Sequence, residues 1–298
     1  MTYRNNGCRL CPRRCGADRR SGEHGVCGAG SSMVAARASL HLWEEPCLSG
    51  ERGSGTIFFS GCPLKCVFCQ NFEISAELHG KKIDADRLCE IFFELREMGA
   101  HNVNLVSPTP YIPEIAQAIK LAKKQGFDLP IVYNSSGYEL VESLKLLDGL
   151  VDVYLPDFKY MSGELAKKYS HAEDYPERAA EAICEMVRQQ PTPKFIGGMM
   201  KKGVLVRHLV LPGQTHNSKA VIKHLYNTFG DSIYLSIMSQ YTPVGELYDF
   251  PELRRTVSAA EYDEVVDFAI DIGVSNGFIQ DGEAAAESFI PVFDGRGI

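Results

Sequence analysis

The chain has 298 residues, of which 45% are hydrophobic and 23% are charged, and its formal net charge is −7. This composition is typical of a globular protein with one large domain, and it excludes a disordered chain and a small disulfide-stapled module. The sequence has no uninterrupted apolar stretch of about 18 residues, the length that a membrane-spanning helix needs. The modest charge does not favour nucleic-acid binding. We therefore expect a cytoplasmic protein that binds neither nucleic acid nor a membrane.

The chain contains ten cysteines, and seven of them fall in two clusters. Because cytosolic thiols are kept reduced, clustered cysteines there indicate a metal site or a catalytic site rather than disulfides. The first cluster is Cys8, Cys11, Cys15 and Cys27; the second is Cys62, Cys66 and Cys69; and Cys47, Cys89 and Cys184 stand alone. We expect Cys89 and Cys184 to be core thiols on the apolar faces of helices.

The first 48 residues are polar and rich in glycine and arginine, so they hold too few apolar side chains to form a core of their own. Four thiolates suit zinc, a single iron or an iron-sulfur cluster, and their spacing does not separate these alternatives. Six arginines against two acids give residues 1–30 a formal charge of about +4, which either compensates an anionic metal centre or forms a contact surface for an electron donor. We predict a metal-binding module over residues 1–48.

Short apolar runs alternate with amphipathic segments after residue 55, a pattern typical of strands and helices around a parallel sheet. The runs are 56–60, 103–107, 131–134, 151–155, 204–211 and 233–239. Helical periodicity occurs at 88–98, 115–122, 176–187 and after Ser258, whose spacing to Glu261 suggests a capping box, and residues 189–203 are typical of a long connection. We predict an α/β fold: a partial (β/α)6 barrel over residues 49–285, followed by a C-terminal tail over 286–298.

The second cysteine cluster follows the first predicted strand directly, with the spacing CxxxCxxC. In a barrel of parallel strands this loop lies at the carboxyl end, where active sites are built. Three thiolates hold three irons of a four-iron cluster and leave the fourth iron open to a substrate ligand. Zinc is the alternative, but it normally takes a fourth protein ligand, and none is obvious nearby.

The segment around this triplet, GSGTIFFSGCPLKCVFCQN, resembles the radical S-adenosylmethionine (SAM) enzymes, whose loop has the same spacing and an aromatic residue before the third cysteine, here Phe68. It is similar to pyruvate formate-lyase activating enzyme and its relatives, above all to an uncharacterised subgroup with an EEP segment, here 44–46. The resemblance continues through NLVSPTP, YNSSGYE, LPDFKY, RHLVLPG and SQYTP. It implies a radical SAM barrel with a [4Fe-4S] cluster that reductively cleaves SAM to a 5′-deoxyadenosyl radical for hydrogen abstraction.

The resemblance also implies partners and leaves alternative functions open. The partners are a protein, peptide or small-molecule substrate and a one-electron donor such as flavodoxin or ferredoxin. The substrate is either a glycyl-radical-type protein that the enzyme activates, or a peptide or small molecule that it modifies. A different class of function is a metal-binding redox sensor or scaffold without catalysis.

Polar side chains at the ends of the later strands are the residues that the resemblance places around SAM. Ser107 and Thr109 stand where many radical SAM proteins have a Gly-Gly-Glu-Pro segment, so their hydroxyls would receive the SAM ammonium, unless the segment is only a stiff turn. Asn134 and Ser136 suit the ribose hydroxyls, with a plain turn as the alternative.

Asp157 and Lys159 share strand parity, so both side chains can face the barrel interior, where they contact the zwitterionic part of SAM or pair with each other. Arg207 and the adjacent His208 point to opposite faces, and we expect Arg207 to bind an anionic group and His208 to be a packing residue. By the same resemblance, Gln240 and Tyr241 stand where the activating enzyme has a histidine that contacts SAM. Glu44 and Glu45 are either functional acids or solvated surface.

Overall fold

A computed structural model describes residues 7–245, 247–280 and 291–298 of the chain. The predicted boundary between residues 285 and 286 lies outside the described residues, and the boundary after residue 48 stays a prediction. No helix in the described ranges has the length and apolar character needed to cross a bilayer.

The six predicted strands form the centre of one sheet, and neighbouring strands among them are parallel. They are β2 (Ser54–Phe59), β4 (Val103–Val106), β5 (Ile131–Ser135), β6 (Val153–Pro156), β8 (Met199–Leu209) and β9 (Tyr234–Met238), and they follow one another in space in this order. Sequential parallel strands need crossover connections, which the intervening helices supply. The predicted α/β fold of partial-barrel type is confirmed.

Four further strands extend this sheet or project from it. β10 (Gly277–Ile279) continues it parallel to β9, β1 (Met33–His41) is antiparallel to β2, β3 (Lys81–Ile83) pairs with β1, and β7 (Lys194–Ile196) pairs with the start of β8. The hairpin of β7 and β8 replaces part of the connection predicted over 189–203. Gly197 and Gly198 have φ of +56° and +77°, so they form the tight turn that glycine pairs favour. A glycine pair is typical of a hairpin turn, but prolines and lysines on either side of it made the segment resemble a loop.

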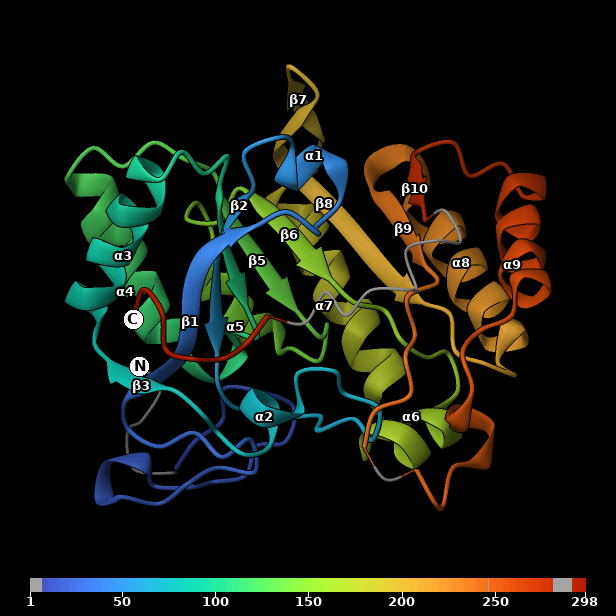
Figure 1. The fold of residues 1–298 in the computed structure, drawn as a ribbon, viewed down its shortest axis with the longest axis horizontal. Helices are drawn as coiled ribbons and strands as arrows, with labels where there is room; N and C mark the ends of the chain where they lie inside the picture. The colour runs from blue at the N-terminus through green and yellow to red at the C-terminus, as the bar shows by residue number, and fades with distance from the viewer. Residues whose placement is uncertain (1–6, 246, 281–290) are drawn as a thin grey trace.

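The longer helices, such as α3, α4, α7, α8 and α9, cover the outer side of the sheet (Figure 1). The helices of the described residues are α1 (Pro46–Ser49), α2 (Phe72–Ser75), α3 (Ala85–Glu97), α4 (Ile112–Lys124), α5 (Val141–Leu144), α6 (Gly163–Ser170), α7 (Tyr175–Gln189), α8 (Thr215–Phe229) and α9 (Ala259–Asp271). Each of the four predicted helices is present, and α9 begins with the predicted capping box between Ser258 and Glu261. The sequence analysis did not predict the short helices α1, α2 and α5 or the longer α6 and α8.

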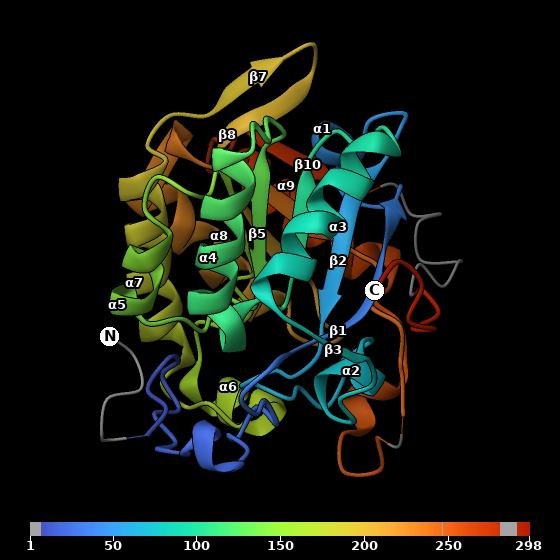
Figure 2. The ribbon, with the colours of Figure 1, turned by 90° about the vertical axis from the view of Figure 1, so that its left-hand side faces the viewer.

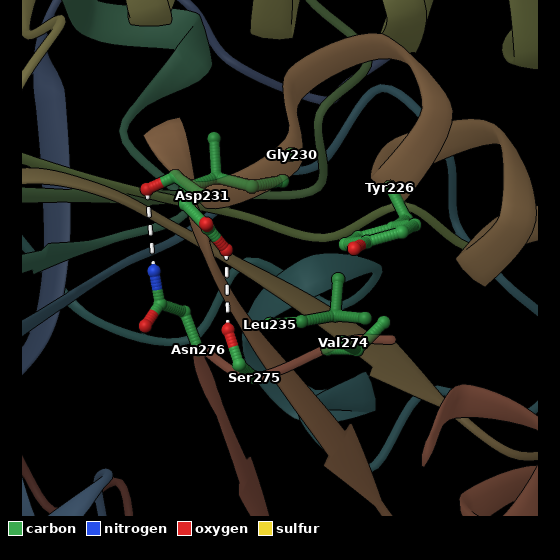
Figure 3. A pocket seen from close by; sticks show the side chains of 8 residues that line it. Tyr226, Gly230, Asp231, Leu235, Val274, Ser275 and Asn276 are labelled. Carbon is green, nitrogen blue, oxygen red and sulfur yellow. Dashed lines mark hydrogen bonds between the residues drawn. The ribbon is translucent and has the colours of Figure 1, made fainter. Parts of the chain in front are cut away.

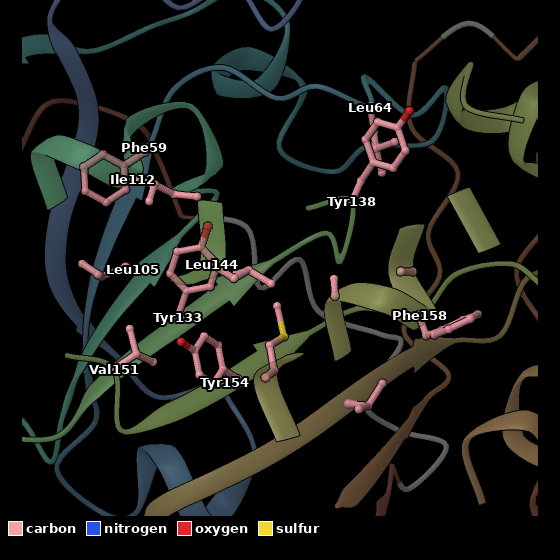
Figure 4. Packing of buried hydrophobic residues seen from close by; sticks show 14 of the residues in the cluster. Phe59, Leu64, Leu105, Ile112, Tyr133, Tyr138, Leu144, Val151, Tyr154 and Phe158 are labelled. Atoms are coloured by element: carbon pink, nitrogen blue, oxygen red, sulfur yellow. The ribbon is translucent and has the colours of Figure 1, made fainter. Parts of the chain in front are cut away.

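Apolar clusters hold the sheet in place, and the two largest lie on different sides of it. The larger cluster packs the helices against the outer side of the sheet and includes Phe59, Leu105, Ile112 and Tyr133 (Figure 4). A smaller cluster fills the amino end of the barrel and joins Cys47 and Leu48 of α1 to side chains of β5, β6 and β8. The segment that carries α1 thus closes the barrel at the end opposite the carboxyl ends of the strands (Figures 1 and 2).

The isolated cysteines have different environments. Cys89 is buried on α3, which confirms the expectation of a core thiol. Cys184 is exposed, so the same expectation for it is wrong. The buried face of α7 passes through Ala179, Ile183 and Met186, and a residue one position after Ile183 is turned about 100° away from that face.

Candidate functional site

A cavity of about 520 Å³ lies at the carboxyl ends of the parallel strands. Cavities of this size suit cofactors and small ligands. Its wall contains the cysteine triplet together with most of the predicted strand-end residues: Cys62, Cys66, Phe68, Cys69, Ser107, Asn134, Ser136, Asp157, Lys159, Arg207 and Gln240. The fold therefore gathers around one space residues that are up to 178 positions apart, counted from Cys62 to Gln240.

Backbone geometry fixes the triplet loop. Gly61, just before the first cysteine, has a φ of +96°, and an added Cβ would meet the carbonyl oxygen of Cys27 at 2.8 Å. Glycine is therefore the residue that this close approach admits. The same contact places the N-terminal segment directly behind the triplet loop. Phe68 packs edge-on against Tyr241, with ring centroids 6.0 Å apart, which holds the aromatic wall of the cavity.

Two serine hydroxyls contact sulfurs of the triplet. The Oγ of Ser170, at the end of α6, donates to Cys66 Sγ at 2.9 Å, and the Oγ of Ser75, at the end of α2, donates to Cys69 Sγ at 3.3 Å. Hydrogen bonds of this kind stabilise thiolate charge. The triplet therefore fits an iron-sulfur cluster both in its soft donor atoms and in its surroundings.

Burial dominates the thiol chemistry of the triplet. It raises the pKa of Cys62 to about 12, and it raises the pKa of Cys66 to about 11 although the Lys159 ammonium opposes it. Buried thiols that must lose protons to act as ligands are stabilised as thiolates by the metal itself. No three His, Cys, Asp or Glu side chains in the described part of the chain lie close enough together to surround a single ion.

Asp157 and Lys159 both face the cavity, as their parity predicts, and they pair with each other: Lys159 Nζ lies 2.5 Å from Asp157 Oδ2. The Asp157 carboxylate is the main factor that raises the pKa of Lys159 against the effect of burial. The pair presents one positive and one negative group side by side beside the triplet. Two opposite charges side by side complement a zwitterion. The ion pair between the two residues is also the second alternative that the sequence analysis gave.

Ser107 and Thr109 follow β4 but have different roles. Ser107 lines the cavity with a φ of +58°, an uncommon conformation for a residue other than glycine and one that is often found at functional sites. Thr109 does not line the cavity, because its hydroxyl donates to the buried Glu139 carboxylate at 2.6 Å. The sequence analysis missed Glu139, whose pKa burial raises to about 7. Glu139 follows β5, and its carboxylate contacts the segment after β4, where many radical SAM proteins have a glutamate and this chain has none.

Of the predicted residues at the ends of β5 and β9, some line the cavity and one does not. Asn134 and Ser136 line the cavity, and the Ser136 Oγ has no hydrogen-bond partner in the described residues, so it is available to a ligand. Gln240 also lines it. Tyr241 is instead buried behind Phe68 and donates to the carbonyl oxygen of Leu253 at 2.7 Å, so it supports the wall from outside.

Arg207 faces the cavity, but it does not present an open anion site. Its guanidinium binds the carboxylates of Glu44 and Glu45, which excludes the interpretation of these acids as solvated surface. His208 points the other way and is buried, with Nδ1 at 2.7 Å from the carbonyl oxygen of Phe158. Burial lowers its pKa to about 4, so it is a packing histidine, as expected.

The four N-terminal cysteines lie together beside the triplet loop but outside the cavity. Burial raises the pKa values of Cys8 and Cys11, and neighbouring cysteines of the same group, Cys15 and Cys27 among them, raise them further. The buried Arg19 donates to Cys27 Sγ at 3.3 Å and to the carbonyl oxygen of Pro110 at 2.7 Å. This contact agrees with charge compensation by arginine.

Comparison with known proteins decides the family. The model of the radical SAM superfamily matches residues 56–225, which is more than half of the chain. The chain belongs to the radical SAM superfamily. The sequence resemblance is thereby confirmed, and radical SAM membership implies SAM, a [4Fe-4S] cluster and radical chemistry.

Individual relatives agree with this assignment. The uncharacterized protein MJ0674 of Methanocaldococcus jannaschii is 30% identical over 271 residues, which cover 88% of this chain and 74% of that protein. Streptococcus suis SuiB bound to the precursor peptide SuiA has a TM-score of 0.51 at 12% identity over 74% of this chain and 46% of SuiB. Methylornithine synthase (PylB) has a TM-score of 0.50 at 14% identity over 70% of this chain and 59% of its own. The chain thus spans less than two thirds of either solved structure, and both likenesses show the radical SAM fold alone.

Several cavity residues of this radical SAM chain escaped the sequence analysis. His41 is the last residue of β1 and Trp43 follows it, Phe58 lies on β2, and Gln70 and Ser75 follow the triplet. The signal for the first two was the apolar run 33–40, which forms a strand that the analysis did not predict. A separate hollow beside Tyr226 and Asp231 holds only about 10 Å³, and Asp231 is already bonded to Ser275 and Asn276 there (Figure 3), so it offers no second site.

Proposed function

We propose that this protein is a radical SAM enzyme that reductively cleaves SAM at a [4Fe-4S] cluster held by Cys62, Cys66 and Cys69. The observation that carries the proposal is the position of these three thiols on one wall of a 520 Å³ cavity, next to the Asp157 and Lys159 pair. The cluster would supply the electron and the open iron. The chain would orient SAM with the zwitterionic pair and the strand-end hydroxyls, and it would limit the access of water to the radical.

The test is formation of 5′-deoxyadenosine by anaerobically reconstituted protein with dithionite and SAM. We expect wild-type protein to form it and the Cys66→Ala variant to fall to background. Cys89→Ala is the matched control, because it removes a buried thiol that lies outside the cavity. An unchanged yield in Cys66→Ala would refute the assignment of the triplet, and metal binding without any SAM cleavage would favour the scaffold function.

The form of the reaction that the sequence resemblance favours is activation of a glycyl-radical-type protein. Modification of a peptide or a small molecule is the alternative. An activating reaction leaves an oxygen-sensitive glycyl radical on its partner, which electron paramagnetic resonance detects. A modifying reaction changes the mass of a stable product. The electron would come from a protein such as flavodoxin or ferredoxin in the cytoplasm, a compartment that keeps cysteines reduced, and none of the ten is in a disulfide here.

We also propose that Cys8, Cys11, Cys15 and Cys27 hold a second metal centre, as zinc, iron or an iron-sulfur cluster. The support is the electrostatic coupling among these thiols, the burial of three of the four side chains and the Arg19 donor at Cys27 Sγ. In the described structure no three of these side chains are arranged around a single ion, so a metal would have to draw them closer together. Four soft sulfur donors with a cation beside them match the chemistry of such a centre. With four protein ligands this site would be closed, in contrast to the open triplet.

A further inference from the structure

A polar layer crosses the interior of the barrel below the predicted SAM residues. We define it as Glu44, Glu45, Asn104, Arg207 and Ser236. It lies between the apolar cluster that α1 closes and the cavity, since Glu44 and Arg207 are part of the cavity wall. The segment before α1 therefore delivers two acids to the floor of the cavity from the end opposite the triplet loop (Figures 1 and 2).

The contacts in this layer are specific. Arg207 binds Glu45 with two nitrogens, Nε at 2.8 Å from Oε1 and Nη2 at 2.6 Å from Oε2, and its Nη2 also contacts Glu44 Oε2. The Asn104 amide donates to Glu44 Oε1 at 2.7 Å. Glu45 thus forms a bidentate pair with the Arg207 guanidinium. Glu44 contacts only Nη2, which also binds Glu45, and Glu44 is the acid that lines the cavity.

Two carboxylates against one guanidinium leave a formal excess of one negative charge in this layer. The side chains are 7% exposed for Glu44, 6% for Glu45 and 13% for Arg207, so water screens this charge poorly. A buried net charge is costly unless a counter-charge is present. The layer therefore favours a cation above it.

Among the residues that the structure describes, the other cationic side chains that line the cavity or lie nearby do not supply this counter-charge. Lys159 is paired with Asp157, and Arg37 is paired with Asp294. His41 lines the cavity, but burial lowers its pKa, so it stays neutral near pH 7 despite the opposing effect of Glu44.

A second observation concerns Asn104, which is not itself part of the cavity wall but holds Glu44, a residue that is. Asn104 is fully buried, and its Oδ1 has no hydrogen-bond partner among the residues that the structure describes. A buried acceptor next to Glu44 is satisfied by an N–H donor. The aromatic side chains of Trp43, the residue before Glu44, and of Phe58 also line the cavity, and aromatic rings attract ammonium and guanidinium groups.

We propose that Glu44, with Asn104 and the aromatic wall, is a subsite for a cationic group of the substrate, a primary ammonium or a guanidinium. The inference rests on the proposed function, because it assigns the substrate half of the same cavity. Arg207 positions Glu44 and Glu45 in this subsite and does not bind an anion itself. Recognition at the floor would leave the carbon atoms next to the cationic group nearer the triplet.

The experiment uses Trp43, which is the single tryptophan of the chain and lies 55% exposed in the cavity wall, as a reporter. Anaerobic holoenzyme with SAM is titrated with Nα-acetyl-lysine amide, Nα-acetyl-arginine amide and the uncharged Nα-acetyl-norleucine amide. We expect at least one cationic probe to bind about 10- to 100-fold more tightly than the norleucine probe, the usual effect of one charged hydrogen bond. Equal affinities, or no saturable binding of either cationic probe, would overturn the inference.

Variants then locate the effect. Glu44→Gln should lose the preference for the cationic probe, whereas Glu51→Gln, the same change at an exposed carboxylate, should keep it. A preference that persists in Glu44→Gln would also overturn the inference. Because the wild-type comparison of probes needs no variant, a folding defect in Glu44→Gln leaves the test intact. SAM cleavage by wild-type protein, assayed in parallel, shows separately whether the proposed function fails.

Discussion

The two cysteine groups lie side by side but have opposite designs. The triplet opens onto a cavity, has only three cysteines, and receives hydrogen bonds from Ser170 and Ser75. The N-terminal group has four cysteines, lies outside the cavity, and has a buried arginine against it. A vacant ligand position is useful only where a substrate can reach it. The difference agrees with the proposal of a reactive centre in the barrel and a closed one in the N-terminal segment.

The largest effect should come from removing each group separately. A Cys8→Ala and Cys11→Ala double variant should lose the N-terminal metal and keep the iron of the triplet, while Cys66→Ala should show the reverse. Iron, sulfide and zinc counted per chain measure both. The same metal content in the double variant and in wild type would show that the N-terminal cysteines hold no metal. The identity of the lost metal decides among zinc, iron and an iron-sulfur cluster.

The second-largest effect should come from breaking the contact between the N-terminal segment and the triplet loop. Arg13 donates to the carbonyl oxygens of Pro63 at 2.8 Å and Ser170 at 3.1 Å, so it joins the N-terminal segment to both sides of the triplet. Arg13→Met should lower the free energy of unfolding by about 2 kcal/mol and increase proteolysis within residues 7–30. Arg14→Met, at an exposed neighbour, is the control. Equal protease resistance in both variants would mean that Arg13 does not hold the segment.

The free energy of unfolding of the barrel should itself depend on pH. This dependence must be known before a loss of metal in acid is assigned to the cysteines. His208 has a pKa of about 4 in the folded protein because it is buried, against an ordinary value near 6.5. The unfolded chain therefore binds more protons below pH 6.5, and stability falls as the pH is lowered toward 4. We expect a loss of about 2 kcal/mol between pH 7 and pH 5 from this residue. Denaturant unfolding of metal-free protein measures it.

Two variants show whether this slope belongs to His208. His208→Gln should flatten the dependence between pH 7 and pH 5, because the residue no longer titrates. His216→Gln, at an exposed position, should leave it unchanged. The same slope in all three proteins would assign the pH dependence to other groups.

The smallest effect should be a change in the reduction potential of the triplet cluster. The hydroxyl donors stabilise negative charge on sulfur, and the reduced cluster carries one more negative charge, so each hydrogen bond raises the potential. Ser170→Ala should lower it, and Ser75→Ala should lower it less, because its hydrogen bond is longer. Redox titration followed by electron paramagnetic resonance gives both values. A higher potential in either variant would contradict this role of the hydroxyl.

Local sequence patterns were enough to predict much of the molecule. The six parallel strands and four of the helices follow from apolar periodicity, because buried strands and amphipathic helices each impose a short repeat. The triplet was recognisable because its three ligands occupy one loop of eight residues between Cys62 and Cys69. Strand parity also placed Asp157 and Lys159 on the interior side.

Only the tertiary structure decided which polar residues meet. Glu44 and Glu45 are more than 160 residues from Arg207, and no local pattern relates them. Thr109 turns from the cavity to Glu139 because a buried carboxylate needs donors, and that acid is brought to it by another strand end. Chain-local chemistry thus determined the elements and the cysteine loop, while the long-range packing of strand ends determined the charges that surround the cavity.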